Sequence, residues 1–244
     1  MTGGTAPAET AFVTAIVPCL DEEAAIADVV TALLANGSHE VIVVDGGSRD
    51  ATRERASFAG ARVLVEPRPG YGLAIQRGIA EAGFRPDILL FVDGDGSDRI
   101  ELAPALIGPI AQGRADFVQG SRLRGTRDPG AVGVAQIVAG RLAGWLLRLR
   151  YGARFTDMSP FRAIRREALG SLGMRESTYG WNLEMLMRAS AARLRCEEVA
   201  VGQRRRQGGV SKVSGDLRVA VRAGWVIGAT FLRLARTLSR LRPG

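Results

Sequence analysis

Short apolar runs alternate with amphipathic stretches along the first half of the chain. The apolar runs have the length of strands, and several end at an aspartate, a proline or another turn residue. They occupy residues 12–17, 41–44, 62–65, 88–92 and 117–119. Helical periodicity fills the intervals near residues 22–34, 50–59, 72–82 and 102–112. This alternation predicts an α/β fold with a doubly wound, mostly parallel central sheet.

The second half contains two long stretches, 132–149 and 217–241, that are apolar but studded with arginine. Neither holds about 18 uninterrupted apolar residues, which argues against a membrane-spanning helix. At about 100° per residue, five arginines of the second stretch form one narrow stripe. They are Arg218, Arg222, Arg233, Arg236 and Arg240. The remaining faces are apolar, which predicts a helix lying in a membrane interface; the alternative is a core helix with a solvated basic face.

Positive charge is concentrated near the C-terminus. The chain of 244 residues has a formal net charge of +8. Residues 199–244 hold ten basic residues and one acidic residue, so this segment carries +9 and the rest of the chain −1. Such a segment predicts an anionic partner, which would be nucleic acid, anionic lipid or a phosphorylated substrate.

Cysteine and histidine are scarce, and this excludes two classes of protein. The two cysteines and one histidine cannot build a disulfide scaffold or a Cys/His zinc cluster. The length suits one large α/β domain or two small ones. The first ten residues lack the basic and apolar regions of a signal peptide, so we expect a cytosolic protein.

A pair of aspartates follows the fourth predicted strand. Residues 91–98 read FVDGDGSD, so the strand delivers Asp93 and Asp95 into a tight glycine-rich loop. Two carboxylates at this spacing are suited to hold Mg²⁺ against a diphosphate. A calcium loop would need a glutamate where Pro104 stands, which excludes that site. The remaining alternative is a structural Asp/Gly turn.

Two other predicted strands end in a similar way. PCLDEE (18–23) follows the first strand, and VDGGSRDAT (44–52) follows the second. Asp45 would accept hydrogen bonds from a nucleobase or ribose, whereas Asp50 is expected to cap the next helix. The turn RPGYG (68–72) lacks the spacing of a P-loop or of the GxGxxG fingerprint, which argues against an ATP or nicotinamide site.

Taken in order, these motifs resemble those of glycosyltransferase family 2 and, more closely, of its dolichyl- or polyprenyl-phosphate sugar synthases. The corresponding segments are PCLDEE, VDGGSRDAT, RPGYGLAIQRG, DGDGSD, GSR (120–122), DMSPFR (157–162) and RQGGVSK (206–212). The resemblance covers residues 12–225 approximately and implies the GT-A fold. Three positions depart from the family pattern: Asp21 replaces an asparagine, Gly46 an aspartate and Pro160 a glycine.

The resemblance implies a nucleotide-sugar site at the strand ends. Its residues would be Pro18, Leu20, Glu22, Asp45, Gly46, Ser48, Gly70, Gly72, Asp93, Gly94, Arg206 and Lys212. Asp93, Asp95 and Ser97 would hold Mg²⁺ or Mn²⁺. Arg206 and Lys212 would add positive charge near the leaving diphosphate.

The later motifs imply the acceptor side of the site. Arg122, Ser159 and Arg162 are expected to clamp an acceptor phosphate, because arginine binds phosphate through two parallel hydrogen bonds. Two aspartates are expected to be catalytic. Asp95 would act through the metal, and Asp157 would position the acceptor or act as a base. The alternative for Asp157 is a turn-capping role.

We therefore expect a metal-dependent inverting glycosyltransferase that moves a hexose from a nucleotide sugar, of the GDP-mannose or UDP-glucose type, to a polyprenyl phosphate. It would be cytoplasmic and peripheral on the inner face of an anionic membrane, with no nucleic-acid partner. The expected parts are a flexible N-terminus (1–10), a GT-A domain (11–214) and a basic amphipathic helix (215–244). The alternatives are a transferase with a soluble, phosphorylated acceptor and a non-catalytic protein that binds nucleic acid or lipid.

Overall fold

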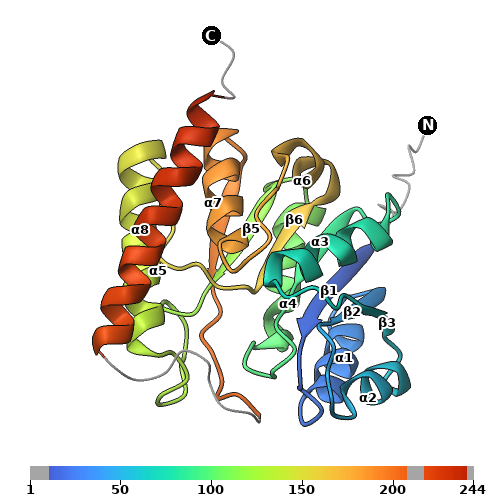
Figure 1. The fold of residues 1–244 in the computed structure, drawn as a ribbon. Coiled ribbons are helices and arrows are strands. Elements are labelled where there is room, and N and C mark those ends of the chain that lie inside the picture. The colour runs from blue at the N-terminus through green and yellow to red at the C-terminus, as the bar shows by residue number, and fades with distance from the viewer. Residues whose placement is uncertain (1–10, 208–216, 241–244) are drawn as a thin grey trace, which may run out of the picture.

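The computed structural model describes residues 11–207 and 217–240 (Figure 1). Within these ranges the strands form one seven-stranded sheet in the order β3-β2-β1-β4-β6-β5-β7. The strands are β1 (Val13–Cys19), β2 (Glu40–Asp45), β3 (Arg62–Val65), β4 (Ile88–Phe91), β5 (Phe117–Ser121), β6 (Arg162–Arg165) and β7 (Cys196–Ala200). Only β6 pairs in the antiparallel sense among these strands, with β4 and β5. The predicted α/β fold with a mostly parallel sheet is confirmed.

Helices cover both faces of the sheet, and each face has its own apolar core. Alternate residues of β1 point to opposite faces, so Val17 joins one core and Ile16 the other. The first face is covered by α1 (Ile26–Ala35), α2 (Thr52–Phe58), η1 (Ile100–Leu102) and α4 (Ala103–Ala111). The second is covered by α3 (Tyr71–Ala82), α5 (Val134–Tyr151), α6 (Arg166–Leu172), α7 (Trp181–Ala191) and α8 (Leu217–Arg240). Burial on both faces explains why the central strands are continuous apolar runs.

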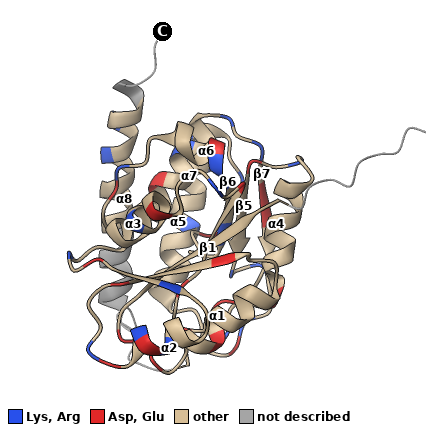
Figure 2. Cartoon of the chain, turned by 90° about the vertical axis from the view of Figure 1, so that its right-hand side faces the viewer, with Lys and Arg blue, Asp and Glu red and all other residues tan. Residues whose placement is uncertain are grey.

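The five predicted strands and the helices of the first half are all present, with ends shifted by a few residues. The sequence pattern did not predict β6, β7, α6 or α7. The sequence of β6 is RAIR and that of β7 is CEEVA, so neither strand is an apolar run. Acidic and basic residues lie side by side around α2 in Figure 2, as expected for a body that is nearly neutral.

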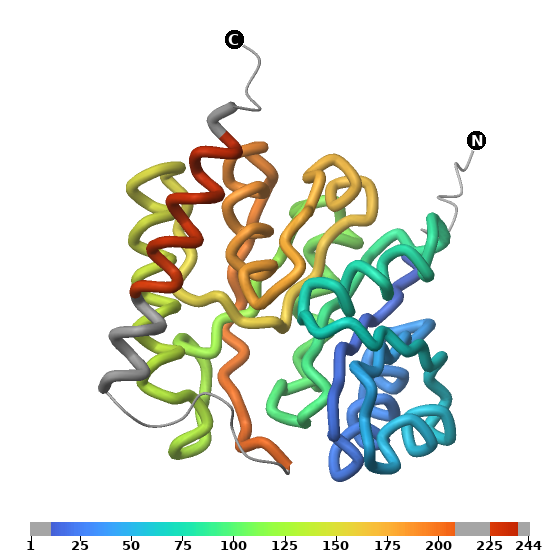
Figure 3. The backbone as a smooth tube through the Cα atoms, viewed as in Figure 1, coloured from blue at the N-terminus to red at the C-terminus, as the bar shows by residue number. Residues whose placement is uncertain are grey.

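Helix α8 lies along α5 and against α7, as Figures 1 and 3 show. Phe231 and Leu234 are buried in the second core, and Ile227 is partly buried beside them. The prediction that these side chains enter a bilayer is therefore wrong, because they pack against the protein. Val226 is half exposed, and Trp225 is more exposed. Among the described residues, no helix is both long and apolar enough to cross a membrane.

Candidate active site

The carboxyl ends of β1, β2 and β4 meet at one edge of the sheet, because the three strands are parallel neighbours. Ligands of open α/β sheets bind at this edge. Two of the loops are locked together: the backbone N–H of Asp21 donates to Ser48 Oγ at 2.9 Å, and Asp21 Oδ1 accepts from the N–H of Arg49 at 2.9 Å. Asp21 has a φ of 55°, which is uncommon outside glycine. The first two motifs thus form one rigid rim.

Asp45 shapes its own turn. Its Oδ2 accepts from the N–H groups of Gly47 and Ser48, both at 3.0 Å, and its Oδ1 accepts from Ser48 Oγ. Asp45 is fully buried, and Ser48 is nearly so. In this structure the polar atoms of both side chains bond inside the loop, and their contact with the nucleotide stays a prediction. Leu20 and Gly46, in contrast, are exposed beside this turn.

The predicted metal loop gathers three carboxylates. Asp95 Oδ1 accepts from the N–H of Ser97 at 3.0 Å and from Ser97 Oγ at 2.6 Å. The backbone N–H of Asp93 donates to Asp98 Oδ2 at 3.1 Å. Burial, and then the charges of Asp98 and Asp95, raise the pKa of Asp93 well above its usual range. Burial and the charge of Asp95 raise the pKa of Asp98 to about 7. The loop therefore concentrates negative charge that a cation would neutralise.

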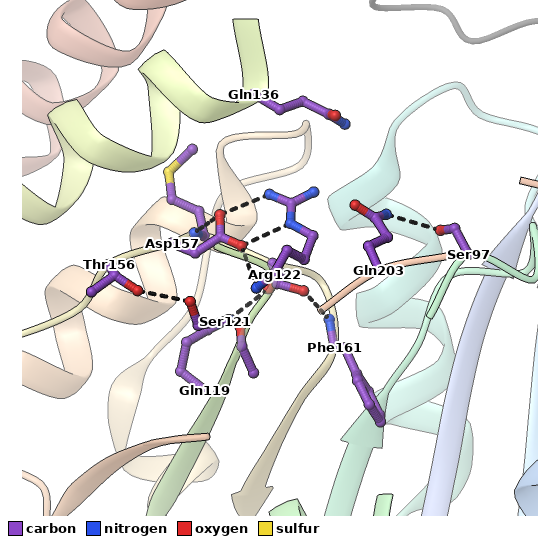
Figure 4. A network of polar contacts seen from close by, with 12 residues as sticks. Ser97, Gln119, Ser121, Arg122, Gln136, Thr156, Asp157, Phe161 and Gln203 are labelled. Atoms are coloured by element: carbon purple, nitrogen blue, oxygen red, sulfur yellow. Dashed lines mark hydrogen bonds and ion pairs between the residues drawn. The ribbon is translucent and has the colours of Figure 1, made fainter. Parts of the chain in front are cut away.

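Gln203, which sequence reasoning did not single out, completes this loop. Its Nε2 donates to Ser97 Oγ at 3.0 Å, as Figure 4 shows, and its side chain is buried. Its Oε1 is buried without a hydrogen-bond partner among the described residues. A buried, unpaired amide oxygen on a residue bonded to the carboxylate loop is of the ligand type that Mg²⁺ or Mn²⁺ takes. Ser97 links Gln203 to Asp95 and so orients the loop.

Across the described ranges, no group of three or more His, Cys, Asp or Glu side chains is arranged as a complete metal cage. Three carboxylates lie in the loop, but they do not converge on one point. This agrees with the way Mg²⁺ binds substrates, since it usually takes one or two carboxylates and completes its shell with phosphate oxygens and water. The donor set here therefore fits a metal that arrives with a diphosphate.

Arg206 closes the loop from the other side. Its guanidinium pairs with Glu22, and its Nε lies 3.7 Å from Asp95 Oδ2. The structure thus brings three predicted donor-site residues together, from loops far apart in the sequence. Lys212, predicted to add charge here, lies outside the described residues.

Arg122 and Asp157 form the centre of the acceptor side (Figure 4). Two parallel hydrogen bonds of 2.8 Å join them, and Asp157 Oδ2 also accepts from the backbone N–H of Arg122 at 3.0 Å. Burial raises the pKa of Asp157, but the hydrogen bonds and charge of Arg122 outweigh this and lower it. A carboxylate held in this way is a poor base. Of the two predicted roles for Asp157, the geometry favours positioning over action as a base.

Two predicted acceptor ligands are fully buried. The guanidinium of Arg162 donates to the backbone carbonyls of Ser159 and Asn182. Ser159 Oγ accepts from the N–H of Phe161 at 3.2 Å. Neither Arg162 nor Ser159 reaches the surface of this structure, and their contact with the acceptor stays a prediction. The charge of Arg122 lowers the pKa values of Asp93 and Asp98, and the charge of Asp93 also acts on the pKa of Arg162.

A tyrosine pair was also missed by sequence reasoning. Tyr71 and Tyr179 are stacked with ring centroids 5.6 Å apart, and the Tyr71 hydroxyl lies 3.4 Å from Asp93 Oδ1. Gly72 permits this arrangement, because a Cβ there would lie 2.3 Å from the carbonyl oxygen of Glu176. A Cβ at Gly70 would likewise lie 2.5 Å from the carbonyl oxygen of Ser177. Both predicted donor-site glycines therefore allow close packing here.

The sequence of residues 14–173 matches the model of glycosyl transferase family 2. An uncharacterized glycosyltransferase of Mycobacterium tuberculosis is 39% identical over 211 residues, which are 86% of this chain and 93% of the relative. A dolichyl-phosphate hexose transferase of Haloferax volcanii is 33% identical over 193 residues, which are 77% of this chain and 81% of the relative. The chain belongs to glycosyltransferase family 2.

A solved structure supports the same assignment. Glucosyl-3-phosphoglycerate synthase from Mycobacterium tuberculosis, crystallised with Mn²⁺, UDP-glucose and phosphoglyceric acid, is similar with a TM-score of 0.72 and 26% identity. The similarity covers 92% of this chain and 79% of that one. The predicted GT-A fold and glycosyltransferase activity are confirmed, and the chain is an enzyme of the hexosyltransferase kind.

Proposed function

We propose that this enzyme transfers a hexose from a nucleotide diphosphate sugar to a phosphate group of its acceptor, with Mg²⁺ or Mn²⁺ at the aspartate loop. The observation that carries the proposal is the surplus of carboxylates at Asp93, Asp95 and Asp98, next to the unpaired oxygen of Gln203. Such a loop needs a cation, and a nucleotide sugar brings the phosphate oxygens that complete the cation's shell. The relative that binds Mn²⁺ and UDP-glucose supports this donor type.

The proposed reaction is a single displacement. An oxygen of the acceptor phosphate forms a bond to the anomeric carbon while the bond from that carbon to the diphosphate breaks. The leaving nucleoside diphosphate keeps the bonding electron pair. When bound by Asp95 and Gln203, the metal would neutralise charge that develops on the leaving group. Arg206 would turn from Glu22 and Asp95 toward the same diphosphate.

A phosphate acceptor agrees with the state of Asp157. A phosphate is already an anion near pH 7, so it needs to be held rather than deprotonated. Arg122 is held in place by Asp157 and lies close enough to Asp93 and Asp98 for its charge to lower their pKa values. We assign the acceptor phosphate to Arg122, with Asp157 as the residue that positions it.

Polyprenyl phosphate is the proposed acceptor, at the cytoplasmic face of a membrane. The name of the Haloferax relative supports this class. Exposed apolar side chains on two neighbouring helices provide a surface for the lipid: Trp145 and Leu149 on α5, Trp225 and Leu232 on α8. Tryptophan is favoured at such interfaces because its ring is apolar and its N–H is polar. Co-sedimentation with anionic vesicles tests this surface. We expect wild type to sediment with the vesicles and the double variant Trp145→Ala/Trp225→Ala to stay in solution.

A soluble phosphorylated acceptor is the second candidate, and a specific observation favours it. Phe231 and Leu234 of α8 are buried in the protein core. This leaves less apolar surface for a bilayer than the sequence predicted. The structural relative that was crystallised with phosphoglyceric acid fits the same conclusion.

The deciding experiment supplies radiolabelled GDP-mannose and UDP-glucose in turn, with Mn²⁺, to reactions containing either a polyprenyl phosphate or 3-phosphoglycerate. The proposal expects label in the lipid fraction and little in phosphoglycerate. Label in phosphoglycerate alone would support the second candidate. Label in neither, with any donor, would contradict a phosphate acceptor.

A further inference from the structure

An ion pair links helix α8 to the loop beside the tyrosine pair. Arg233 of α8 pairs with Glu176, which belongs to residues 173–180 between α6 and α7. The side chain of Glu176 is 8% exposed, whereas that of Arg233 is 58% exposed. The carboxylate is therefore set into the protein and is neutralised by a helix that is distant in sequence. Among the described contacts, Thr178 Oγ1 also donates to Glu176 Oε1, at 2.9 Å.

The same loop packs on the start of α3. The carbonyl of Glu176 accepts from Gln76 Nε2 at 2.9 Å, and the carbonyl of Ser177 accepts from the N–H of Leu73 at 3.1 Å. Gly72 has no side chain to hold the two segments apart. The position of residues 176–177 therefore determines where α3 begins, and Tyr71 is its first residue.

From α3 the contacts continue into the site. Tyr71 is stacked on Tyr179, which the same loop carries, and its hydroxyl lies 3.4 Å from Asp93 Oδ1. An unbroken series of contacts thus runs from Arg233 through Glu176 and the tyrosine pair to Asp93. In this series, Arg233 contacts Glu176, residues 176–177 contact the start of α3, and Tyr71 contacts Asp93.

We propose that Arg233 and Glu176 are positioning residues through which α8 holds the tyrosine pair beside Asp93. This inference rests on the proposed function for its consequence on donor binding, but not for its structural one. Removing Arg233 takes away the counter-ion of the Glu176 carboxylate, so the loop loses its ionic contact with α8. Neither residue touches the reacting groups, so both are expected to act only through the position of Tyr71 beside Asp93.

The test compares Arg233→Gln with Arg236→Gln, a control one turn further along α8 whose side chain is also exposed. Hydrogen exchange of residues 173–180 gives a readout that needs no substrate. We expect exchange there to rise at least tenfold in Arg233→Gln and in Glu176→Gln, but not in the control. Arg233→Lys is expected to restore protection, because it keeps the charge.

Donor binding provides the second readout. The dissociation constant of the nucleotide-sugar donor, measured with Mn²⁺ present, is expected to rise three- to tenfold in Arg233→Gln and to stay within twofold of wild type in Arg236→Gln. Effects of Arg233→Gln and Glu176→Gln should not add in the double variant. Unchanged hydrogen exchange of residues 173–180 in Arg233→Gln would overturn the inference. Fully additive effects of the two substitutions in the double variant would also overturn it. If exchange rises but no transfer to any phosphate acceptor is found, the proposed function fails and the positioning role stands.

Discussion

The guanidinium of Arg122 and the carboxylate of Asp157 are joined by two parallel hydrogen bonds of 2.8 Å, with both side chains buried. Arg122 lies at the end of β5, and Asp157 lies in the segment that leads to β6. The pair therefore fixes an arginine between the end of β5 and the segment that precedes β6. An arginine held in this way would lose little side-chain conformational entropy on binding a phosphate.

Asp157→Asn is expected to damage both stability and transfer. It leaves Arg122 buried without a counter-charge, which costs about 3–5 kcal/mol when one partner of a buried pair is removed. Urea unfolding measures the first effect, and the acceptor dependence of initial rates measures the second, where we expect kcat/KM to fall at least tenfold. Asp116→Asn, which removes the partner of the exposed Arg195, is the control and should cost far less. Equal losses in the two variants would argue against a special role for the buried pair.

The stabilising effect of Asp157 is expected to depend on pH in one direction. Its folded-state pKa is lowered from 3.8, so the unfolded chain binds the proton more tightly. The stabilisation is therefore fully present above about pH 4 and is lost as the pH falls through the folded-state pKa. The gap in unfolding free energy between wild type and Asp157→Asn should be constant from pH 7 to 5 and narrow below 3.8. A gap that widens on acidification would contradict the ion pair.

Gln203→Leu is expected to weaken metal binding while the fold stays intact. The substitution keeps the volume but removes the buried oxygen that we assign to the cation, so the dissociation constant for Mn²⁺ should rise at least tenfold. Titration of Mn²⁺ by electron paramagnetic resonance, with UDP present, measures this without turnover. Gln112→Leu, at an exposed position after α4, is the control and should bind Mn²⁺ as wild type does. Wild-type affinity in Gln203→Leu would remove this residue from the metal site.

Two adjacent residues of α8 test whether the helix belongs to the core. Phe231→Ala removes a ring that is 5% exposed and should lower the free energy of unfolding by about 3–5 kcal/mol. Leu232→Ala removes a side chain that is 56% exposed and should stay within about 0.5 kcal/mol of wild type. Urea unfolding of each variant measures the two changes in the free energy of unfolding. Comparable small effects in both would restore the prediction of a detached interfacial helix.

The sequence predicted the parallel part of the sheet because each of its strands is an apolar run between amphipathic helices. It also predicted that Asp93 and Asp95 share a site with Glu22 and Arg206, through the resemblance of ordered motifs. It could not separate a core helix from an interfacial one at 217–241, because both need one apolar face and one basic face. Only the contacts of Phe231 and Leu234 with the body show which arrangement the chain adopts.

The site residues that were missed or misplaced have a common cause. Gln203 and Tyr179 lie in segments that come to the site only through tertiary packing, and a neutral amide or an exposed tyrosine carries no signal by itself. Arg162 and Ser159 match the family motif, yet they serve its backbone, since their polar groups bond to carbonyl and N–H groups of the chain. A motif identifies which residues belong together, whereas packing in the fold determines what each of them contacts.

The most direct test of the account is the rate of hexose transfer by Asp95→Asn at saturating Mn²⁺. Loss of one group that stabilises developing charge costs about 10²–10³ in rate, so we predict turnover reduced by at least that factor. Asp28→Asn, an exposed change on α1, is the matched control and should retain wild-type turnover. Circular dichroism would verify that both variants are folded. Wild-type turnover in a folded Asp95→Asn variant would contradict a metal-dependent site at this loop.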